Sequence, residues 1–238
     1  FPSMRLLRLL AAFVCTATMS LAAAYTWTGA AGDHAYGNPA NWAGNAVPPN
    51  DGTAVLVFGA AADKSVTLPL YLDVAQVRFS SPAQNYTFGS ALLSFLVVEN
   101  GLVCNAGNQR IGNGVTLSLA GSQNISVTSG TLELAGGLIG TGSLVKTGSG
   151  ELRVTGVNLL AGGTQVSSGS VVFANTYALP AGSITASAGG YVGAEDATTL
   201  KYLLGQLESG TFTGAIGLDS APGAATSVYS DQIDVTGL

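Results

Sequence analysis

The chain has 238 residues, of which 47% are hydrophobic and only 9% are charged, and its formal net charge is −5. This hydrophobic content excludes a solvated disordered coil, which requires low hydrophobicity and a high charge. An acidic chain without a run of Lys and Arg is also unsuited to nucleic-acid binding, because phosphate contacts require basic clusters.

The first 24 residues have the pattern of a secretory signal peptide. Arg5 and Arg8 precede an apolar stretch, 9–21, and three alanines follow that end at Ala24. A basic start, a short apolar centre and small residues before the cut define such a peptide. The stretch is shorter than the roughly 20 residues that a spanning helix needs. We therefore expect cleavage after Ala24 and export by the general secretory route, with an uncleaved anchor helix as the alternative.

Segment 25–60 contains both tryptophans, Trp27 and Trp42, among Gly- and Pro-rich residues. One interpretation is a sugar-binding surface, because aromatic faces stack on pyranose rings. The other is a cap whose indoles cover the end of a repeat fold, since an uncovered end exposes an unpaired strand edge. We favour the cap and assign 25–60 to it.

A repeat close to 20 residues long runs through the centre of the chain. Octads at 129–136, 149–156 and 168–175 read Ser-Gly, variable, apolar, variable, apolar, small, then Gly or Asn. Their apolar residues alternate, which is typical of strands with one buried face. Short strands, Gly corners and a fixed period indicate a β-solenoid of stacked parallel coils. We assign 61–196 to this parallel β-helix, best supported between 96 and 192, with a β-sandwich of hairpins as the alternative.

The densest pattern lies between Gly140 and Gly169. It reads Gly-Thr-Gly-Ser-Leu-Val-Lys-Thr-Gly-Ser-Gly, then Glu-Leu-Arg-Val-Thr-Gly, then Asn158, Gly-Gly-Thr at 162–164 and a closing Ser-Gly. This stretch resembles the autotransporter-associated β-strand repeat, also called the passenger-associated transport repeat, and it keeps that family's lysine as Lys146. It departs from the family at 159–161, where Leu-Leu-Ala replaces a frequent Thr-Tyr-Thr.

The resemblance covers about a third of the chain. It implies a right-handed parallel β-helix in the passenger region of an exported or cell-surface bacterial protein. It also implies that the chain is the N-terminal piece of a longer protein, associated with the outer membrane if a C-terminal barrel follows.

Segment 197–238 is expected to hold a short helix and the start of a further repeat. Leucines at 200, 203, 204 and 207 follow the helical spacing i, i+3, i+4, i+7. Asp196 precedes them as a candidate N-cap. This pattern predicts an amphipathic helix that packs on the solenoid, while 233–238 resemble the opening of another strand.

Candidate chemical groups are few and separated in the sequence. His34 is the only histidine, so a Ser-His-Asp triad would depend on it. A metal site from Asp33, His34 and Asp51 has no recognised spacing. Cys104 is the only cysteine after residue 24, and a single cysteine builds neither a disulfide nor a metal site.

Carboxylates on the repeat strands are the remaining candidates for catalysis. Glu133 and Glu151 lie one coil apart on outward positions, and Arg153 shares the repeat offset of Glu133. A surface ion pair between Glu133 and Arg153 is favoured over a catalytic dyad. The glycines of 136–142 lack the Lys and Ser/Thr that a phosphate-binding loop needs. We therefore predict no catalytic, cofactor-binding or metal-binding residue.

These observations lead to two hypotheses about function. The first is a secreted or cell-surface structural module, a scaffold or adhesin, with surface glycans or neighbouring cell surfaces as partners. It is not expected to bind nucleic acid, and it is expected to contact membranes only through export and through any C-terminal region that follows residue 238. The second is a polysaccharide lyase or hydrolase, which rests on fold analogy. Convergence of three or more acidic residues in one groove would favour the enzyme, and we expect these residues to be scattered.

Overall fold

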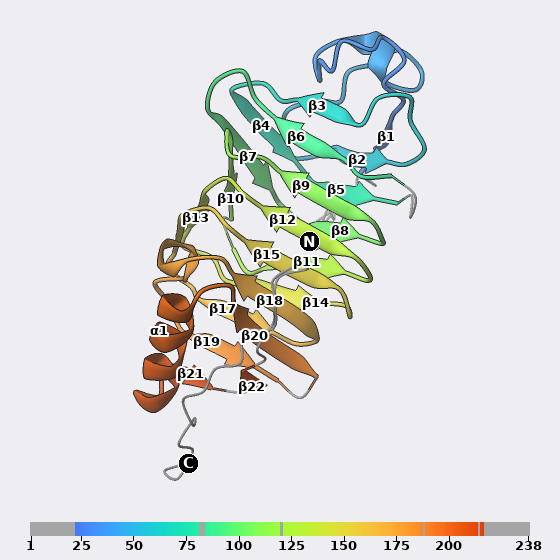
Figure 1. The fold of residues 1–238 in the computed structure, drawn as a ribbon. Helices are drawn as coiled ribbons and strands as arrows, with labels where there is room; N and C mark the ends of the chain where they lie inside the picture. The colour runs from blue at the N-terminus through green and yellow to red at the C-terminus, as the bar shows by residue number, and fades with distance from the viewer. Residues whose placement is uncertain (1–21, 81–83, 120, 188, 214, 217–238) are drawn as a thin grey trace, which may run out of the picture.

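The computed structural model describes residues 22–80, 84–119, 121–187, 189–213 and 215–216. It is a right-handed parallel β-helix with one α-helix beside its C-terminal coils (Figure 1), as the sequence predicts. The predicted signal peptide falls almost entirely outside the described residues. Within them, no helix is both long and apolar enough to cross a membrane.

Three parallel sheets form the walls of the β-helix. Sheet A has nine strands: β1 (Ala24–Trp27), β2 (Val55–Phe58), β5 (Gln76–Phe79), β8 (Leu102–Cys104), β11 (Gln123–Val127), β14 (Leu144–Thr147), β17 (Thr164–Val166), β19 (Ile184–Ala186) and β21 (Phe212–Thr213). Sheet B has eight strands: β3 (Ser65–Thr67), β6 (Thr87–Gly89), β9 (Asn108–Ile111), β12 (Thr131–Leu134), β15 (Glu151–Val154), β18 (Gly169–Phe173), β20 (Gly190–Ala194) and β22 (Ala215–Ile216). Sheet C has five strands: β4 (Tyr71–Val74), β7 (Ser94–Val98), β10 (Val115–Ser118), β13 (Leu138–Gly140) and β16 (Asn158–Leu160).

From β3 onward, each coil visits sheet B, then sheet C, then sheet A. The last two coils replace the sheet C strand with a helix. The 3-10 helix η2 (Thr176–Ala178) takes this place first, and α1 (Ala197–Glu208) takes it next. Another 3-10 helix, η1 (Pro39–Asn41), belongs to the N-terminal loop. The predicted helix is confirmed, and Asp196 caps it by accepting a hydrogen bond from the Thr199 amide at 2.8 Å.

The alternation of apolar and polar residues decides which side chains face inward. Leu132 and Leu134 of β12 align with Leu152 and Val154 of β15, and all four are buried. Strand neighbours in parallel sheets stack about 4.8 Å apart, so inward side chains form continuous apolar columns. The result is one hydrophobic core that runs from Trp27 to Phe212.

Parallel pairing extends beyond segment 61–196 at both ends. Strands β1 and β2 lie within the segment expected to be a cap, yet they pair in register with each other and with β5. At the other end, β19 pairs with β21 and β20 with β22. The first coils lack the Gly-rich octads and fill their core with aromatic side chains instead. Phe58, for example, lies 4.8 Å from Phe88 between ring centroids.

Close stacking at the corners explains the regular glycines. A Cβ added at Gly156 would lie 1.7 Å from the carbonyl oxygen of Gly136, and one added at Gly136 would lie 1.7 Å from that of Val115. Both distances are far inside van der Waals contact, so no side chain fits between successive coils there. Gly130 and Gly169 also adopt φ of 75° and 69°, a region that favours glycine.

Candidate functional site

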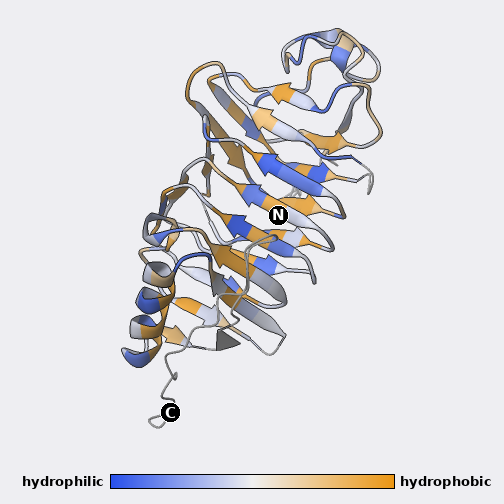
Figure 2. Cartoon of the chain, viewed as in Figure 1, coloured by the Kyte–Doolittle hydropathy of each residue, from blue (hydrophilic) through white to orange (hydrophobic). Residues whose placement is uncertain are grey.

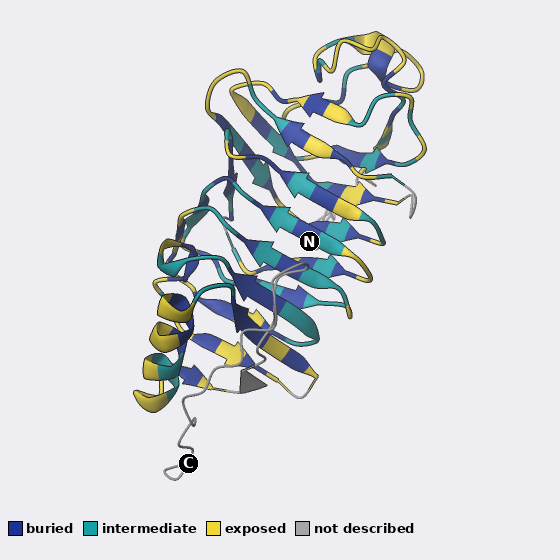
Figure 3. Ribbon diagram, in the orientation of Figure 1, coloured by how far each residue is buried: buried dark blue, intermediate teal, exposed yellow. Residues whose placement is uncertain are grey.

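A shallow groove of about 400 Å³ lies on the outer face of sheet B. Figure 3 shows this face as largely intermediate or exposed, in contrast to the buried inward positions of the same strands. The groove is lined by the outward side chains of β6, β9, β12, β15 and β18 together with Glu195: Thr87, Asn108, Arg110, Thr131, Glu133, Glu151, Arg153 and Val172, with Gln109 beneath them.

Strand register brings these charges together. Arg110, Glu133 and Arg153 are direct partners across β9, β12 and β15. Glu151 lies two residues before Arg153 on the same strand, so it faces the same side of the sheet. Glu195 is the first residue after β20, and its side chain lines the same groove. Three carboxylates therefore line one groove, and the expectation of scattered acidic residues is wrong.

Two ion pairs organise the groove, and neither is the pair expected from the repeat. Arg110 pairs with Glu133, which also accepts a hydrogen bond from the Thr155 hydroxyl at 3.2 Å. Arg153 pairs through two nitrogens with Glu195, and its Nη2 donates to Oε2 at 2.6 Å. The hydrogen bond to Glu195 raises the pKa of Arg153 against the lowering effect of burial, and the charges of Glu195, Glu133 and Glu151 raise it further. Arg110 and Glu195 had not been singled out from the sequence.

Lys146, the lysine of the family-like motif, lies inside the β-helix and not in the groove. Its side chain is fully buried on sheet A between Ile125 and Val166 of the neighbouring coils. The Nζ donates to the carbonyl oxygens of Thr147 at 2.9 Å, Gly148 at 2.7 Å and Ser168 at 3.2 Å. These contacts join the corner after β14 to the next coil, so the role of this lysine is structural.

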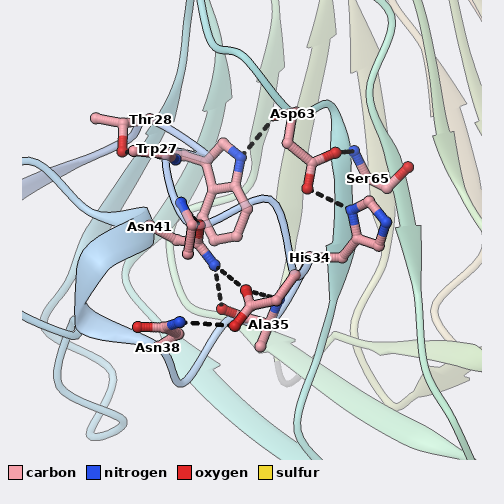
Figure 4. Close-up of polar contacts among 11 residues, drawn as sticks. Trp27, Thr28, His34, Ala35, Asn38, Asn41, Asp63 and Ser65 are labelled. Carbon is pink, nitrogen blue, oxygen red and sulfur yellow. Dashed lines mark hydrogen bonds and ion pairs between the residues drawn. The ribbon is translucent and has the colours of Figure 1, made fainter.

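A second polar cluster closes the N-terminal end (Figure 4). The Asp33 carboxylate accepts hydrogen bonds from the Asn38 and Asn41 amides, both at 2.6 Å, and these bonds lower its pKa. His34, which adopts a positive φ of 62°, pairs through Nδ1 with Asp63. Sequence reasoning had not identified Asp63, because its partner lies 29 residues earlier in the chain.

The two tryptophans belong to this end of the core. Trp27 and Trp42 are 0% and 1% exposed, and their rings meet edge to face with centroids 5.2 Å apart. The Trp42 indole donates to the Tyr36 carbonyl at 2.7 Å. Buried rings offer no face for a sugar, so the packing agrees with a capping role and not with sugar stacking.

The suggested metal ligands do not converge. Asp33 is occupied by the asparagines, His34 by Asp63, and Asp51 by its own turn, where it accepts a hydrogen bond from the Thr53 hydroxyl at 2.6 Å. In the part of the chain that the structure describes, no group of three His, Cys, Asp or Glu side chains could hold a metal ion.

Comparison with known proteins adds no relative to this description. No family model, no curated protein and no solved structure matches the chain. The resemblance to the autotransporter-associated repeat consequently remains a prediction, carried by the sequence motif and compatible with the parallel β-helix.

Proposed function

We propose that the chain is an exported structural module of the passenger type, which serves as a scaffold or adhesin at the cell surface or outside the cell. The observation that carries this proposal is the continuous stack of parallel coils around one core. Repeat folds of this kind are extended and present long, regular surfaces. The sequence pattern of residues 1–24 supports export, and the motif around Lys146 supports the passenger type.

Export is tested by expressing the chain in a bacterium with a C-terminal tag and separating the cell fractions. We expect tagged protein outside the cytoplasm with Tyr25 as its first residue, because small residues precede the predicted cut. The matched control replaces Arg5 and Arg8 with Glu, which removes the basic start and should retain the protein in the cytoplasm. Uncleaved cytoplasmic protein from the unchanged chain would contradict export.

The adhesive role requires a separate measurement. Purified protein is expected to bind bacterial or host cells, or a glycan array, through one outer face of the β-helix. If cells or glycans retain the protein but it does not distinguish one glycan from another, the result would support a scaffold. If one glycan retains the protein selectively and the free glycan displaces it, the result would support an adhesin. Failure to bind any cell or glycan would remove the adhesive half of the proposal.

The groove of sheet B supports a second candidate function, binding or cleavage of a polysaccharide. Glu133 and Glu151 lie on neighbouring strands, diagonally across the sheet. A strand spacing of about 4.8 Å and a two-residue rise of about 6.6 Å place their Cα atoms roughly 8 Å apart. Carboxyl groups of glycosidase pairs lie about 5–10 Å apart, a range that two Glu side chains on Cα atoms at this spacing can reach.

This second candidate is tested on purified protein with pectin, alginate and chitin derivatives, with and without Ca²⁺. If the groove is catalytic, Glu151→Gln should reduce product formation by at least about a hundredfold, since general acid–base catalysis contributes that much. Glu208→Gln, at the exposed end of α1, is the matched control. The absence of product from every substrate would eliminate the enzyme and leave the scaffold.

A further inference from the structure

The large exposed hydrophobic residues gather on one side of the β-helix. Nine such residues are exposed among the described ones. Eight of them belong to segments between a sheet B strand and the following sheet A strand, which we call the C side. These eight are Leu70, Tyr71, Leu92, Leu93, Val157, Leu159, Tyr177 and Tyr202. The ninth, Tyr191, lies in β20 of sheet B.

The outward positions of sheet C join these residues into a stripe. One column in register across the sheet runs through Asp73, Val97, Ser118, Ile139 and Leu159. Val97 and Ile139 are partly exposed, and Leu159 is 63% exposed. In Figure 2 the sheet C strands are mainly orange, whereas β9, β12 and β15 of sheet B carry blue residues.

The stripe is also free of charge along its centre. The C-side segments of four consecutive coils, 112–122, 135–143, 155–163 and 174–183, contain no Asp, Glu, Lys, Arg or His in the sequence. The sheet B strands of the same region carry Arg110, Glu133, Glu151 and Arg153. Depletion of charge with exposed tyrosine and aliphatic residues is typical of the buried centre of a protein interface.

Charges return only at the two ends of the C side: the N-terminal end is acidic, and the C-terminal end carries Lys201, the one basic residue of the C side, together with Glu195, Asp196 and Glu208. The N-terminal end carries Asp73 and the exposed Glu99. The C-terminal end carries the exposed Lys201 on α1. The acidic residues near Lys201 have other places: Asp196 caps the helix, Glu195 pairs with Arg153, and Glu208 lies at the far end of α1.

We propose that the C side is the contact surface for a second copy of this chain, packed antiparallel around a two-fold axis. In that orientation Glu99 of one copy meets Lys201 of the other, twice, while the uncharged centres cover each other. A parallel arrangement would instead place Glu99 opposite Glu99. A two-fold interface uses the same patch on both subunits, which this stripe, uncharged in the middle with Glu99 toward one end and Lys201 toward the other, satisfies.

The size of the patch predicts a reversible dimer. Seven coils contribute to the C side, from β4 to α1. At about 4.8 Å per coil and a width of about 13 Å for a four-residue strand, the flat area is roughly 400 Å² per copy. Specific interfaces of standard size bury about 800 Å² per partner. The expected contact is therefore a weak, reversible protein–protein interface. Its dissociation constant is measured over a series of protein concentrations.

Sedimentation equilibrium of the purified chain tests the surface. We expect a monomer–dimer equilibrium, and we expect Leu159→Lys to weaken it about tenfold or more by placing a charge in the apolar centre. Both the change and its control are at exposed positions, so the fold is preserved. The control is Tyr191→Lys, which is 49% exposed on sheet B and should leave the equilibrium unchanged. A monomer at all concentrations, or a dimer indifferent to Leu159→Lys, would overturn the proposal.

Charge exchange tests the antiparallel orientation. Glu99→Lys and Lys201→Glu should each weaken the dimer by about two- to fivefold, because each replaces an attraction with a repulsion. The double variant E99K/K201E restores the attraction and should return the dissociation constant close to that of the unchanged chain. Additive weakening in the double variant would contradict this packing.

Discussion

Lys146 shows how one buried side chain joins successive coils of the β-helix. Three backbone carbonyls surround its ammonium group, two from the corner after β14 and one, of Ser168, from the following coil. The aliphatic stem lies in the column of inward residues between Ile125 and Val166. The lysine of the family-like motif therefore connects successive coils from inside the β-helix.

Replacement of Lys146 by Met should destabilise the protein. The variant keeps the apolar stem but leaves carbonyl oxygens without a donor, which costs about 2 kcal/mol for buried acceptors. Urea denaturation measures the change in the free energy of unfolding. Lys201→Met is the matched control, because Lys201 is exposed, and it should stay within about 0.5 kcal/mol. Equal stabilities of the two variants would show that the carbonyl contacts contribute little.

Stability should also depend on pH through this lysine. Burial lowers the pKa of Lys146 from its ordinary 10.5 to about 8, with a smaller opposite effect from Cys104. Above pH 8 the folded chain loses this proton while the unfolded chain keeps it, so the unfolded state binds more protons. Stability then rises with pH, by at most about 1.4 kcal/mol per unit.

The window for this measurement is set by Cys104. Burial raises the pKa of its thiol from 9.0 to about 11, so the thiol opposes folding as the pH rises above 9. Between pH 8 and 9 Lys146 acts without that opposition. Urea denaturation over this range should show the unchanged chain gaining stability relative to Lys146→Met. Parallel curves for the two proteins would contradict the lowered pKa of Lys146.

At the scale of the element, the corners restrict the sequence more strongly than the strands do. Strand positions accept Leu, Val, Ile or Phe on the inside, whereas some corners approach the preceding coil so closely that only glycine fits. Gly156 and Gly136 are examples, since a Cβ on either would meet a backbone oxygen at 1.7 Å. This contact between coils, and not only backbone flexibility, explains why glycine recurs at these corners.

Gly156→Ala should therefore cost about 3 kcal/mol or more, because the backbone of two coils must shift to admit the methyl group. The matched control is Gly205→Ala in α1, where an added Cβ has no neighbour within 4 Å. That change should stabilise the helix by about 0.5–1 kcal/mol, since alanine is the better helix former. Thermal or urea denaturation distinguishes the two, and a neutral effect of Gly156→Ala would contradict the stacking argument.

At the scale of the whole molecule, each coil is stabilised chiefly by its two neighbours. The core is continuous, but contacts between coils are local, which makes the fold nearly one-dimensional. The N-terminal end is covered by the loop that carries η1, with Trp42 packed against Trp27 and hydrogen-bonded to Tyr36. The stability of the first coils should therefore depend on the cap, and the stability of the distant coils should depend on the cap very little.

Trp42→Ala tests this locality. Loss of a buried tryptophan should cost about 3–5 kcal/mol in the coils that it covers. Amide hydrogen exchange is expected to show reduced protection in β1, β2 and β3 and unchanged protection in β15 and β18. A uniform loss along the rod would indicate a single cooperative unit instead.

The sequence by itself determined the elements with a strong local signal. Alternating residues such as Leu132 and Leu134 predicted the strands, the spaced glycines predicted stacked coils, and Asp196 with the leucine stripe predicted α1. These features are visible because period and turn chemistry act within a few residues. The first coils were missed as coils, because they pack aromatic rings such as Phe58 and lack the glycine octads.

Only the tertiary structure decided which distant residues meet. Arg153 was expected to pair with Glu133, its neighbour in register, but its partner is Glu195, 42 residues later. Coils differ in length, so a period near 20 residues does not specify which charges share a face. The groove of sheet B and the apolar C side both follow from the register of strands that are far apart in the chain. That register depends on how every intervening coil packs, which no local pattern encodes.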